Sequence, residues 1–452
     1  MRLNLKRIKN FPTGHILAVI TATKPDFYKQ APIVHAAIEH DLPVCIINTG
    51  QHYDEILGFG LNEFNLNLSI IADLEIRGNL IEKTSGLVRA IARLHKILRK
   101  TRPDITFHPL VHGDTIVAGV FPMAWMFATG MKSYHNESGL RAMTPIQPGR
   151  FHRQDLTKFL SKQFSKDSWR LTRLEPFPEQ YDTFISSAAS DLLLAPTELN
   201  KDHLLREGYS EYQISVSGNS IVDAVAETRK RPPEVSIFEQ VSKLESDCWL
   251  RVDIHRRANL IEHRFRAIVG GIRELVRAKF NVCWVMLNAT KFALKKFHLE
   301  KSLYNLAAKY PNFIITDLWK EYKQVIEFFD SGHCWASYTD SGSQTEELTL
   351  FPNVRCLIAR YSTDRPESVF DANSSVIVPP ISRFFISKTI KLLHRWEELW
   401  QPKNRNVYGS PGKVSSAIVE TIRDRMESNP TGFQWDHNRL FGTVNDETAN
   451  FL

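Results

Sequence analysis

Short runs of β-branched and aliphatic residues alternate along this chain with longer segments whose apolar residues recur every three or four positions. The clearest helical segment is Ile81–Arg99, in which Leu87, Ile91, Leu94 and Leu98 share one face. A short apolar run between polar turns is typical of a strand buried in a parallel sheet. The pattern therefore predicts an α/β protein in which strands and helices alternate.

The predicted strands fall into two sets, one in each half of the chain. The first set is His15–Thr21, Val44–Thr49, Ile105–Pro109 and Leu192–Ala195. The second set is Trp249–Ile254, Val282–Met286, Asn312–Thr316, Cys334–Tyr338 and Val354–Ala359, and the helix Ile261–Lys279 lies among them. We expect two doubly wound Rossmann-like lobes with a boundary near Pro196–Asn200. Ligands of such sheets bind beyond the carboxyl ends of the strands, which predicts a cleft between the lobes.

Two segments break the pattern. Ala142–Leu174 contains no predicted strand, and its only acidic residues are Asp155 and Asp167. Its seven basic residues are Arg150, Arg153, Lys158, Lys162, Lys166, Arg170 and Arg173. A surface excursion is the favoured interpretation, and a lid or anion-binding arm is the alternative. The polar tail after Met426 contains scattered aromatic residues and is assigned no element.

Composition narrows the class of protein. A length of 452 residues fits two lobes better than one core, and 43% hydrophobic with 24% charged residues is ordinary for a folded soluble chain. The net charge of +7 fits an ordinary surface, or else an anionic ligand such as a nucleotide diphosphate.

The cysteines and the apolar runs bear on the compartment. The five cysteines are scattered without a CxxC pair, which favours a reducing compartment and neither a disulfide framework nor a structural zinc. No run reaches the roughly 18 apolar residues of a membrane span, and His15–Thr21 is too short for a signal core. We therefore expect a cytoplasmic protein without a membrane span, and the scattered His and Cys offer no metal site.

Polar clusters follow several predicted strands. They are Thr49–His52, His112–Thr115, His135–Arg141, Pro176–Glu179, His255–Arg257 and Thr339–Gln344. Gly-Asp-Thr at 113–115 could be a plain helix cap, and Ser341-Gly342-Ser343 a plain turn. The turn could also present backbone amides to a diphosphate, which His255-Arg256-Arg257 would match with cationic donors. The shared position at strand ends favours the functional interpretation.

In order and wording these motifs resemble the UDP-N-acetylglucosamine 2-epimerase family, of the non-hydrolysing type, over roughly residues 14 to 425 apart from the insertion. Further matching motifs are Ala195–Glu198, Ser217–Asp223, Thr339–Glu347 and Thr363–Glu367. The resemblance implies a GT-B fold with a UDP-sugar between the lobes. It also implies inversion of C2 through loss of UDP to a 2-acetamidoglucal and its re-addition, without a cofactor.

The resemblance also implies roles for individual residues. Asp114, Glu137 and Glu179 match catalytic carboxylates, Lys29 an essential lysine, and His255 a histidine beside the diphosphate. The expected substrate-binding residues are Lys24, Gln51, His52, Arg141, Arg256, Ser341, Gly342, Ser343, Glu347 and Arg365, with Tyr322 as a weaker candidate near uracil. The implied partner is a UDP-sugar, with a homodimer possible and no nucleic acid.

The implied domains are 1–196 for the first lobe and 197–387 for the UDP-binding lobe. Residues 388–426 would form helices that cross back to the first lobe, and 427–452 a tail.

The chain departs from the family pattern in several places. Lys24-Pro25-Asp26 replaces Arg-Pro-Glu, which removes a bidentate fork, and Thr183 stands where an arginine is frequent. Ala258 and Met286–Ala289 replace residues of a second, activating site. Arg173, in the insertion, could supply a replacement cation.

Three alternatives remain open. A hydrolysing relative would release ManNAc and UDP, although Gln51-His52 resembles the non-hydrolysing branch more. A GT-B glycosyltransferase would use the same UDP-sugar site, and the basic insertion would fit it. A silent UDP-sugar-binding protein is disfavoured because it would keep costly buried charges without a proton to move.

Overall fold

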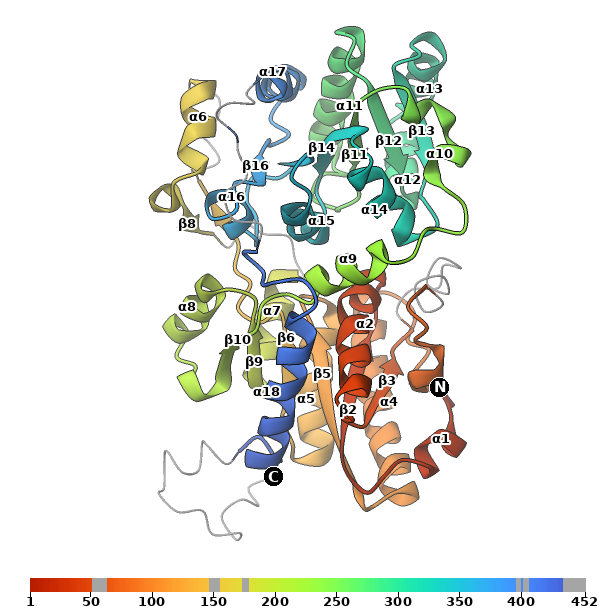
Figure 1. The fold of residues 1–452 in the computed structure, drawn as a ribbon, viewed down its shortest axis with the longest axis vertical. Coiled ribbons are helices and arrows are strands. Elements are labelled where there is room, and N and C mark those ends of the chain that lie inside the picture. The colour runs from red at the N-terminus through yellow and green to blue at the C-terminus, as the bar shows by residue number, and fades with distance from the viewer. Residues whose placement is uncertain (51–62, 146–154, 173–178, 396–399, 401–405, 434–452) are drawn as a thin grey trace. The chain divides into compact units, whose positions relative to one another are not determined.

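The computed structural model describes residues 1–50, 63–145, 155–172, 179–395, 400 and 406–433. The chain divides into two compact units. The first unit comprises Met1–Leu140, Phe177–Glu227 and Tyr408–Leu452, and the second comprises Arg141–Pro176 and Thr228–Val407. Each unit is built on its own sheet of mainly parallel strands with helices packed against it (Figure 1). The predicted α/β class is therefore confirmed.

The first unit contains an eight-stranded sheet. Its spatial order is β1 (Arg2–Leu3), β4 (Ile70–Asp73), β3 (Val44–Asn48), β2 (Gly14–Thr21), β5 (Ile105–His112), β6 (Ser133–Asn136), β9 (Ser190–Ala195) and β10 (Ile214–Val216). β1 pairs antiparallel with β4, and the other neighbours pair in parallel. β2 and β9 are buried almost throughout, as expected for central parallel strands.

Helices pack against this sheet. The helices that the structure describes in this unit are α1 (Leu5–Lys9), α2 (Lys24–Glu39), α4 (Leu80–Thr101), α5 (Ile116–Thr129), α7 (Glu179–Ala188), α8 (Glu198–Arg206), most of α9 (Ile221–Arg229) and α18 (Val414–Ser428). The predicted apolar stripe of Leu87, Ile91, Leu94 and Leu98 is the buried face of α4. The prediction for Ile81–Arg99 is confirmed with two or fewer residues added at each end.

The second unit contains a six-stranded parallel sheet. Its spatial order is β13 (Phe313–Asp317), β12 (Val282–Met286), β11 (Trp249–Asp253), β14 (Cys334–Thr339), β15 (Arg355–Ile358) and β16 (Ser375–Ile377). Its helices are α6 (Leu156–Gln163), α10 (Ile237–Gln240), α11 (Glu262–Arg277), α12 (Asn288–Lys296), α13 (Glu300–Lys309), α14 (Tyr322–Asp330), α15 (Gly342–Glu347), α16 (Glu367–Phe370) and α17 (Arg383–His394).

Both sheets reverse their winding direction at one point. In the first unit the chain runs outward from β2 through β3 to β4, then returns to β5 on the other side of β2. In the second unit it runs from β11 through β12 to β13, then returns to β14 on the other side of β11. In doubly wound sheets, ligands bind beyond the carboxyl ends of the strands at such a reversal point. Candidate site residues follow the two central strands of each sheet, which are β2 and β5 in the first unit and β11 and β14 in the second.

The structure corrects the interpretation of Ala142–Leu174 as a strandless surface excursion. Met143 in β7 (Met143–Thr144) pairs antiparallel with Leu171 in β8 (Arg170–Leu171). On α6, Phe159 and Leu160 are buried in the core of the second unit. The amide side chain of Gln163 both donates to and accepts from the backbone of Ile377, at 3.1 and 2.7 Å. The described parts of this segment therefore belong to the second unit, because Phe159, Leu160 and Gln163 form one buried face of α6.

The predicted domain boundary also differs from the structure. Residues 197–227 belong to the first unit, since β10 extends its sheet by pairing with β9. Residues 388–407 stay with the second unit, while 408–452 belong to the first. On α18, the guanidinium of Arg423 donates to the carbonyl of His40, and Arg425 pairs with Asp191 at 2.9 Å. The crossing back to the first unit is therefore made by the last helix and not by α17.

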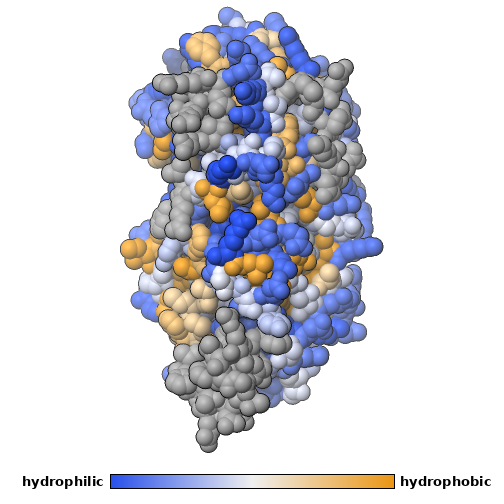
Figure 2. Space-filling view, turned by 90° about the vertical axis from the view of Figure 1, so that its left-hand side faces the viewer, coloured by the Kyte–Doolittle hydropathy of each residue, from blue (hydrophilic) through white to orange (hydrophobic). Residues whose placement is uncertain are grey.

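The described surface is mixed. On the face drawn in Figure 2, hydrophobic residues lie in small groups among hydrophilic ones. Large exposed apolar side chains such as Ile81, Phe127 and Phe292 belong to different helices. No helix in the described part of the chain combines the length and apolar character needed to cross a membrane.

Candidate active site

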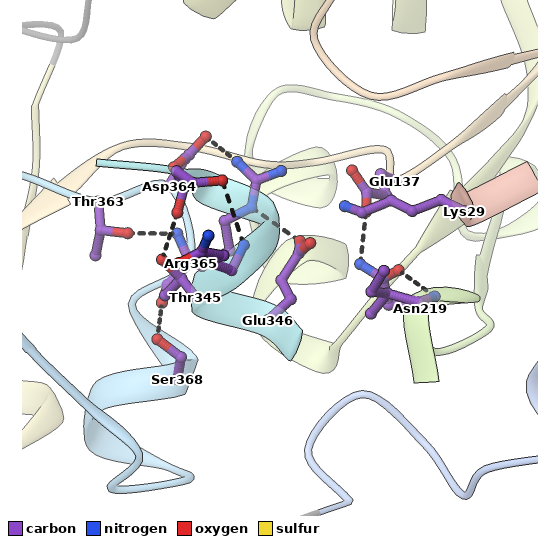
Figure 3. A network of polar contacts seen from close by, with 12 residues as sticks. Lys29, Glu137, Asn219, Thr345, Glu346, Thr363, Asp364, Arg365 and Ser368 are labelled. Atoms are coloured by element: carbon purple, nitrogen blue, oxygen red, sulfur yellow. Dashed lines mark hydrogen bonds and ion pairs between the residues drawn. The ribbon is translucent and has the colours of Figure 1, made fainter. Parts of the chain in front are cut away.

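A buried ion pair joins helix α2 to the turn after β6. Lys29 is on α2, the helix that follows β2, and its ammonium group donates to Oε1 of Glu137, which follows β6 (Figure 3). The two side chains are 0% and 1% exposed. Nδ2 of Asn219 donates to the same carboxylate oxygen at 2.6 Å. Lys29 and Glu137 were predicted from the sequence, and the structure brings them into contact.

His112, the last residue of β5, joins this ion pair to the start of α2. Its Nδ1 lies 2.8 Å from Oδ1 of Asp26, and its Nε2 lies 3.3 Å from Oε2 of Glu137. Burial disfavours the imidazolium, but the charges and hydrogen bonds of Glu137 and Asp26 outweigh burial and raise the pKa of His112 to about 9. Glu137 is therefore held between two cations, Lys29 and His112.

Asp26 is held by the backbone it caps. Its Oδ2 accepts the N–H groups of Ala22 and Thr23, at 3.0 and 2.6 Å, and forms a capping box with Thr23 at the start of α2. Asp26, which stands where the family pattern has the longer Glu, thus serves both as a helix cap and as the partner of His112. Lys24 is the first residue of α2, and its side chain lies outside the described residues, as do Gln51 and His52.

A second cluster in the first unit consists of carboxyl groups. Asp182 on α7 is fully buried, and among the described residues neither of its oxygens has a hydrogen-bond donor. Burial, followed by the charges of Asp114 and Glu179, raises the pKa of Asp182 to about 8. Asp114 and Glu179 were predicted as catalytic carboxylates, and the structure groups both with this third carboxyl. The helix cap that was the alternative interpretation of Gly-Asp-Thr is made by Thr115, whose hydroxyl accepts the N–H of Ala118 at 3.3 Å. Asp114 is therefore not the cap of α5.

In the second unit, His255 follows β11 at the reversal point. Its Nδ1 lies 3.1 Å from Oδ1 of Asp253 and 3.4 Å from Oδ1 of Asp340, which follows β14. Burial opposes the charged ring, but Asp340 and Asp253 prevail and raise the pKa of His255. Asp340 also accepts the backbone N–H groups of His255 and Arg256, both at 3.0 Å. One carboxylate therefore fixes the backbone of the predicted His-Arg-Arg motif.

Cationic side chains gather around α15. Arg365 donates from Nε to Oε1 of Glu346 at 2.8 Å and from Nη1 to Asp364 (Figure 3). A Cβ added at Gly342 would lie 3.0 Å from Nη1 of Arg365 and 3.2 Å from Nη2 of Arg256. Both guanidinium groups thus stand directly against the glycine backbone, and any side chain there would displace them.

The sequence predicts that Ser341, Gly342 and Ser343 present backbone amides to a diphosphate, and the structure fits this for Gly342 and Ser343 only. Ser341 is the N-cap of the helix, and its own N–H is donated to Oγ1 of Thr339 at 3.0 Å. Gly342 and Ser343 are the first two helical residues, so no earlier helical carbonyl accepts their amides. Glu347 ends the helix and is buried, as is Arg141 at the beginning of the second unit.

Sequence reasoning missed several polar residues of these clusters. His112, Asp26 and Asn219 lay inside recognised motifs but were given no role. Asp182 and Asp253 were not singled out. The available signals were the spacing of three between Glu179 and Asp182 on a helix, and the alternation of Arg251, Asp253 and His255 along a strand.

Comparison with known proteins identifies the family of this chain. A sequence model described as UDP-N-acetylglucosamine 2-epimerase matches residues 171–423. The chain is 27% identical over 430 residues to the UDP-N-acetylglucosamine 2-epimerase of Methanocaldococcus jannaschii, with 90% of this chain and 98% of that protein covered. It is 25% identical over 423 residues to the enzyme of that name in Escherichia coli K12, with 90% and 98% covered.

A solved structure agrees with the sequence matches. The M. jannaschii UDP-GlcNAc 2-epimerase in complex with UDP-GlcNAc and UDP has a TM-score of 0.70 and 25% identity to this chain. The match covers 90% of this chain and 99% of that one. The expected GT-B class, with two Rossmann-like units, is therefore confirmed.

Proposed function

Because the chain belongs to the UDP-N-acetylglucosamine 2-epimerase family, we propose that it interconverts UDP-GlcNAc and UDP-ManNAc. In this isomerisation the C1–O bond breaks and its electron pair leaves with UDP, while a base takes the C2 proton and a 2-acetamidoglucal forms. A proton then returns to the other face of C2, and UDP adds back to C1. The M. jannaschii relative was solved in complex with UDP-GlcNAc and UDP.

The observation that carries this proposal is the carboxyl cluster of Asp114, Glu179 and Asp182. Moving a carbon-bound proton in both directions needs acid–base groups whose proton affinity lies near neutral pH. Burial, followed by the charges of Asp114 and Glu179, raises the pKa of Asp182 to about 8, so the cluster contains one acid–base group of the required kind. We assign the proton transfers at C2 to Asp114 and Glu179.

Glu137 has a different electrostatic setting. Its carboxylate is paired with two cationic side chains, Lys29 and His112. We therefore propose that Glu137 holds Lys29 in place as a cation for the negative charge that develops as UDP departs. This assignment keeps both residues essential but separates them from the proton transfers.

The second unit offers groups suited to a diphosphate. Arg256 and Arg365 are cationic, and the first amides of α15 add donors beside them. The neighbouring carboxylates raise the pKa of His255, which favours its charged form. We propose that these groups bind the diphosphate of UDP and that Glu347 accepts the ribose hydroxyls.

Incubation with UDP-GlcNAc in deuterium oxide tests the function. We expect UDP-ManNAc to form with deuterium at C2, detected by NMR and mass spectrometry. Free ManNAc with UDP would show hydrolysis instead, and the absence of C2 exchange would exclude both activities.

Variants test the assignment of the carboxyl groups. Asp114→Asn and Glu179→Gln should each lower C2 exchange by about 100-fold or more while UDP binding persists. The exposed residue Glu245 provides a matched control, and Glu245→Gln should leave exchange unchanged. Undiminished exchange in both carboxyl variants would contradict the assignment.

A further inference from the structure

Three polar residues alternate along β11 and its continuation. Arg251 and Asp253 lie within the strand, and His255 follows two residues later, so all three fall on one side of the extended chain. Arg251 is 2% exposed and Asp253 is 5% exposed. A buried arginine and a buried aspartate in the middle strand of a sheet are costly unless they are paired, which implies that this row has a purpose.

The arginine at the inner end of the row is held by aromatic rings. Its guanidinium carbon lies 5.1 Å from the ring centroid of Trp319 and 5.8 Å from that of Phe329. Its Nη1 lies 3.3 Å from Oδ2 of Asp253. Arg251 is therefore fixed by packing and offers one charged edge to the aspartate.

Asp253 is in turn oriented from both sides. Oδ2 accepts from Nε2 of Gln344 at 2.9 Å, and Oδ1 faces Nδ1 of His255 at 3.1 Å. Burial would favour the neutral acid, but His255 and Arg251 together lower the pKa of Asp253 to about 2. The carboxylate is ionised at neutral pH and its two oxygens have different partners.

The two carboxylates near His255 have different tasks. Asp340 accepts the backbone N–H of His255, the N–H of Arg256 and Nδ2 of Asn259, and it lies farther from the ring, at 3.4 Å. Asp253 makes the closer contact with the ring and none with the backbone of the turn. Asp340 thus fixes the turn, whereas Asp253 fixes the imidazole.

We propose that Asp253, backed by Arg251, is a positioning residue that keeps the Nδ1–H of His255 directed inward and leaves Nε2–H as the donor to the diphosphate. A carboxylate behind an imidazole sets its tautomer and favours its charged form, which strengthens a hydrogen bond to an anion. The charged groups that face His255 are Asp253, Asp340 and its neighbour Arg256. The inference rests on the proposed function only in naming the diphosphate as the ligand.

The tautomer of His255 tests the proposal without any substitution at Asp253. In ¹⁵N NMR spectra of the full chain, the His255 signals are identified by their loss in His255→Gln. We expect the neutral ring, at high pH, to carry its proton on Nδ1. A neutral ring protonated on Nε2 would overturn the proposal.

Binding of UDP supplies the second test. Asp253→Asn should lower the pH at which His255 titrates. It should weaken UDP binding roughly tenfold more at a pH between the titration midpoints of the two rings than at a pH below both. In the background of His255→Gln, the same substitution should have no further effect on UDP affinity. Equal effects at both pH values, or additive effects of the two substitutions, would overturn the proposal.

These outcomes separate the two proposals. If the wild-type chain fails to bind UDP or to epimerise the sugar while the tautomer and titration of His255 are as expected, the proposed function is refuted. The positioning of His255 by Asp253 is then still supported. If UDP binds and the tautomer is the other one, only the positioning role falls.

Discussion

Lys29 and Glu137 come from segments more than one hundred residues apart and form an ion pair that solvent does not reach. Removing one member of such a pair leaves a buried charge without its partner, at a cost on the order of 3 to 5 kcal/mol. We therefore expect Lys29→Met to lower the free energy of unfolding by about that amount and to abolish epimerisation. Urea unfolding followed by circular dichroism measures the first effect.

A surface pair provides the matched control for this prediction. Lys201 and Glu211 lie 3.7 Å apart, with side chains 29% and 73% exposed. Pairs of this kind contribute about 0 to 1 kcal/mol, so Lys201→Met should change stability little. A loss for Lys29→Met no larger than that for Lys201→Met would refute the importance of the buried pair.

His112 makes the stability of the first unit depend on pH. Its pKa is about 9 in the folded chain and about 6.5 when unfolded, so its stabilising effect is complete below about pH 6.5 and disappears as the pH rises through about 9. His112→Asn lacks this titration. The difference in unfolding free energy between wild type and variant, measured in urea, should therefore shrink from about pH 6 to about pH 9.5. A difference that is constant over this range would show that His112 is not charged.

Asp182 should also make the free energy of unfolding depend on pH, but here the variant becomes more stable than the wild type as the pH rises. With its pKa raised to about 8, the folded chain keeps a proton that the unfolded chain releases near pH 4, so stability falls as the pH rises from about 4 to about 8. Asp182→Asn, which resembles the neutral acid, should be more stable than wild type at about pH 9 and similar at about pH 4. The exposed Asp247 serves as control, and Asp247→Asn should be equivalent to wild type at both pH values.

The parts of the fold that could be predicted are those with strong periodicity. Strands such as β2 and β12 are nearly continuous apolar runs because both sheet faces are covered, and α4 shows its buried face at helical spacing. β10 was missed because it is a three-residue strand at the sheet edge whose side chains are partly exposed. Without β10, no predicted element after β9 belongs to the first sheet, and the predicted domain boundary near Pro196–Asn200 therefore comes too early in the chain.

The candidate site divides in the same way. Charged residues in recognisable motifs, such as Lys29 and His255, could be selected from the sequence. Asp253 and Asp182 could not be selected in this way, because the sequence pattern places Asp253 in a strand and Asp182 on a polar helix face. Pairing depends on which side of a strand or helix meets which neighbour, and this is decided by the tertiary fold.

Gly139 tests how tightly the turn after Glu137 is packed. Its φ of +81° is rarely adopted by other residues, and an added Cβ would meet the backbone oxygen of Asn200 and lie 2.9 Å from the carbonyl carbon of that residue. Gly130 has a similar φ of +73° and nothing within 4 Å of an added Cβ. Gly130→Ala should therefore cost only the backbone strain, about 1 to 2 kcal/mol.

Gly139→Ala should cost clearly more, because a backbone neighbour must move as well. The carbonyl of Gly139 accepts from Nδ2 of Asn200 at 3.3 Å and from Nδ1 of His203 at 3.1 Å, and the shift would disturb both bonds. Since Glu137 is two residues away, epimerisation should fall together with stability. Thermal unfolding and the C2-exchange assay on both variants measure this, and equal losses would mean that the left-handed backbone, and not the contact with Asn200, is what requires glycine in this turn.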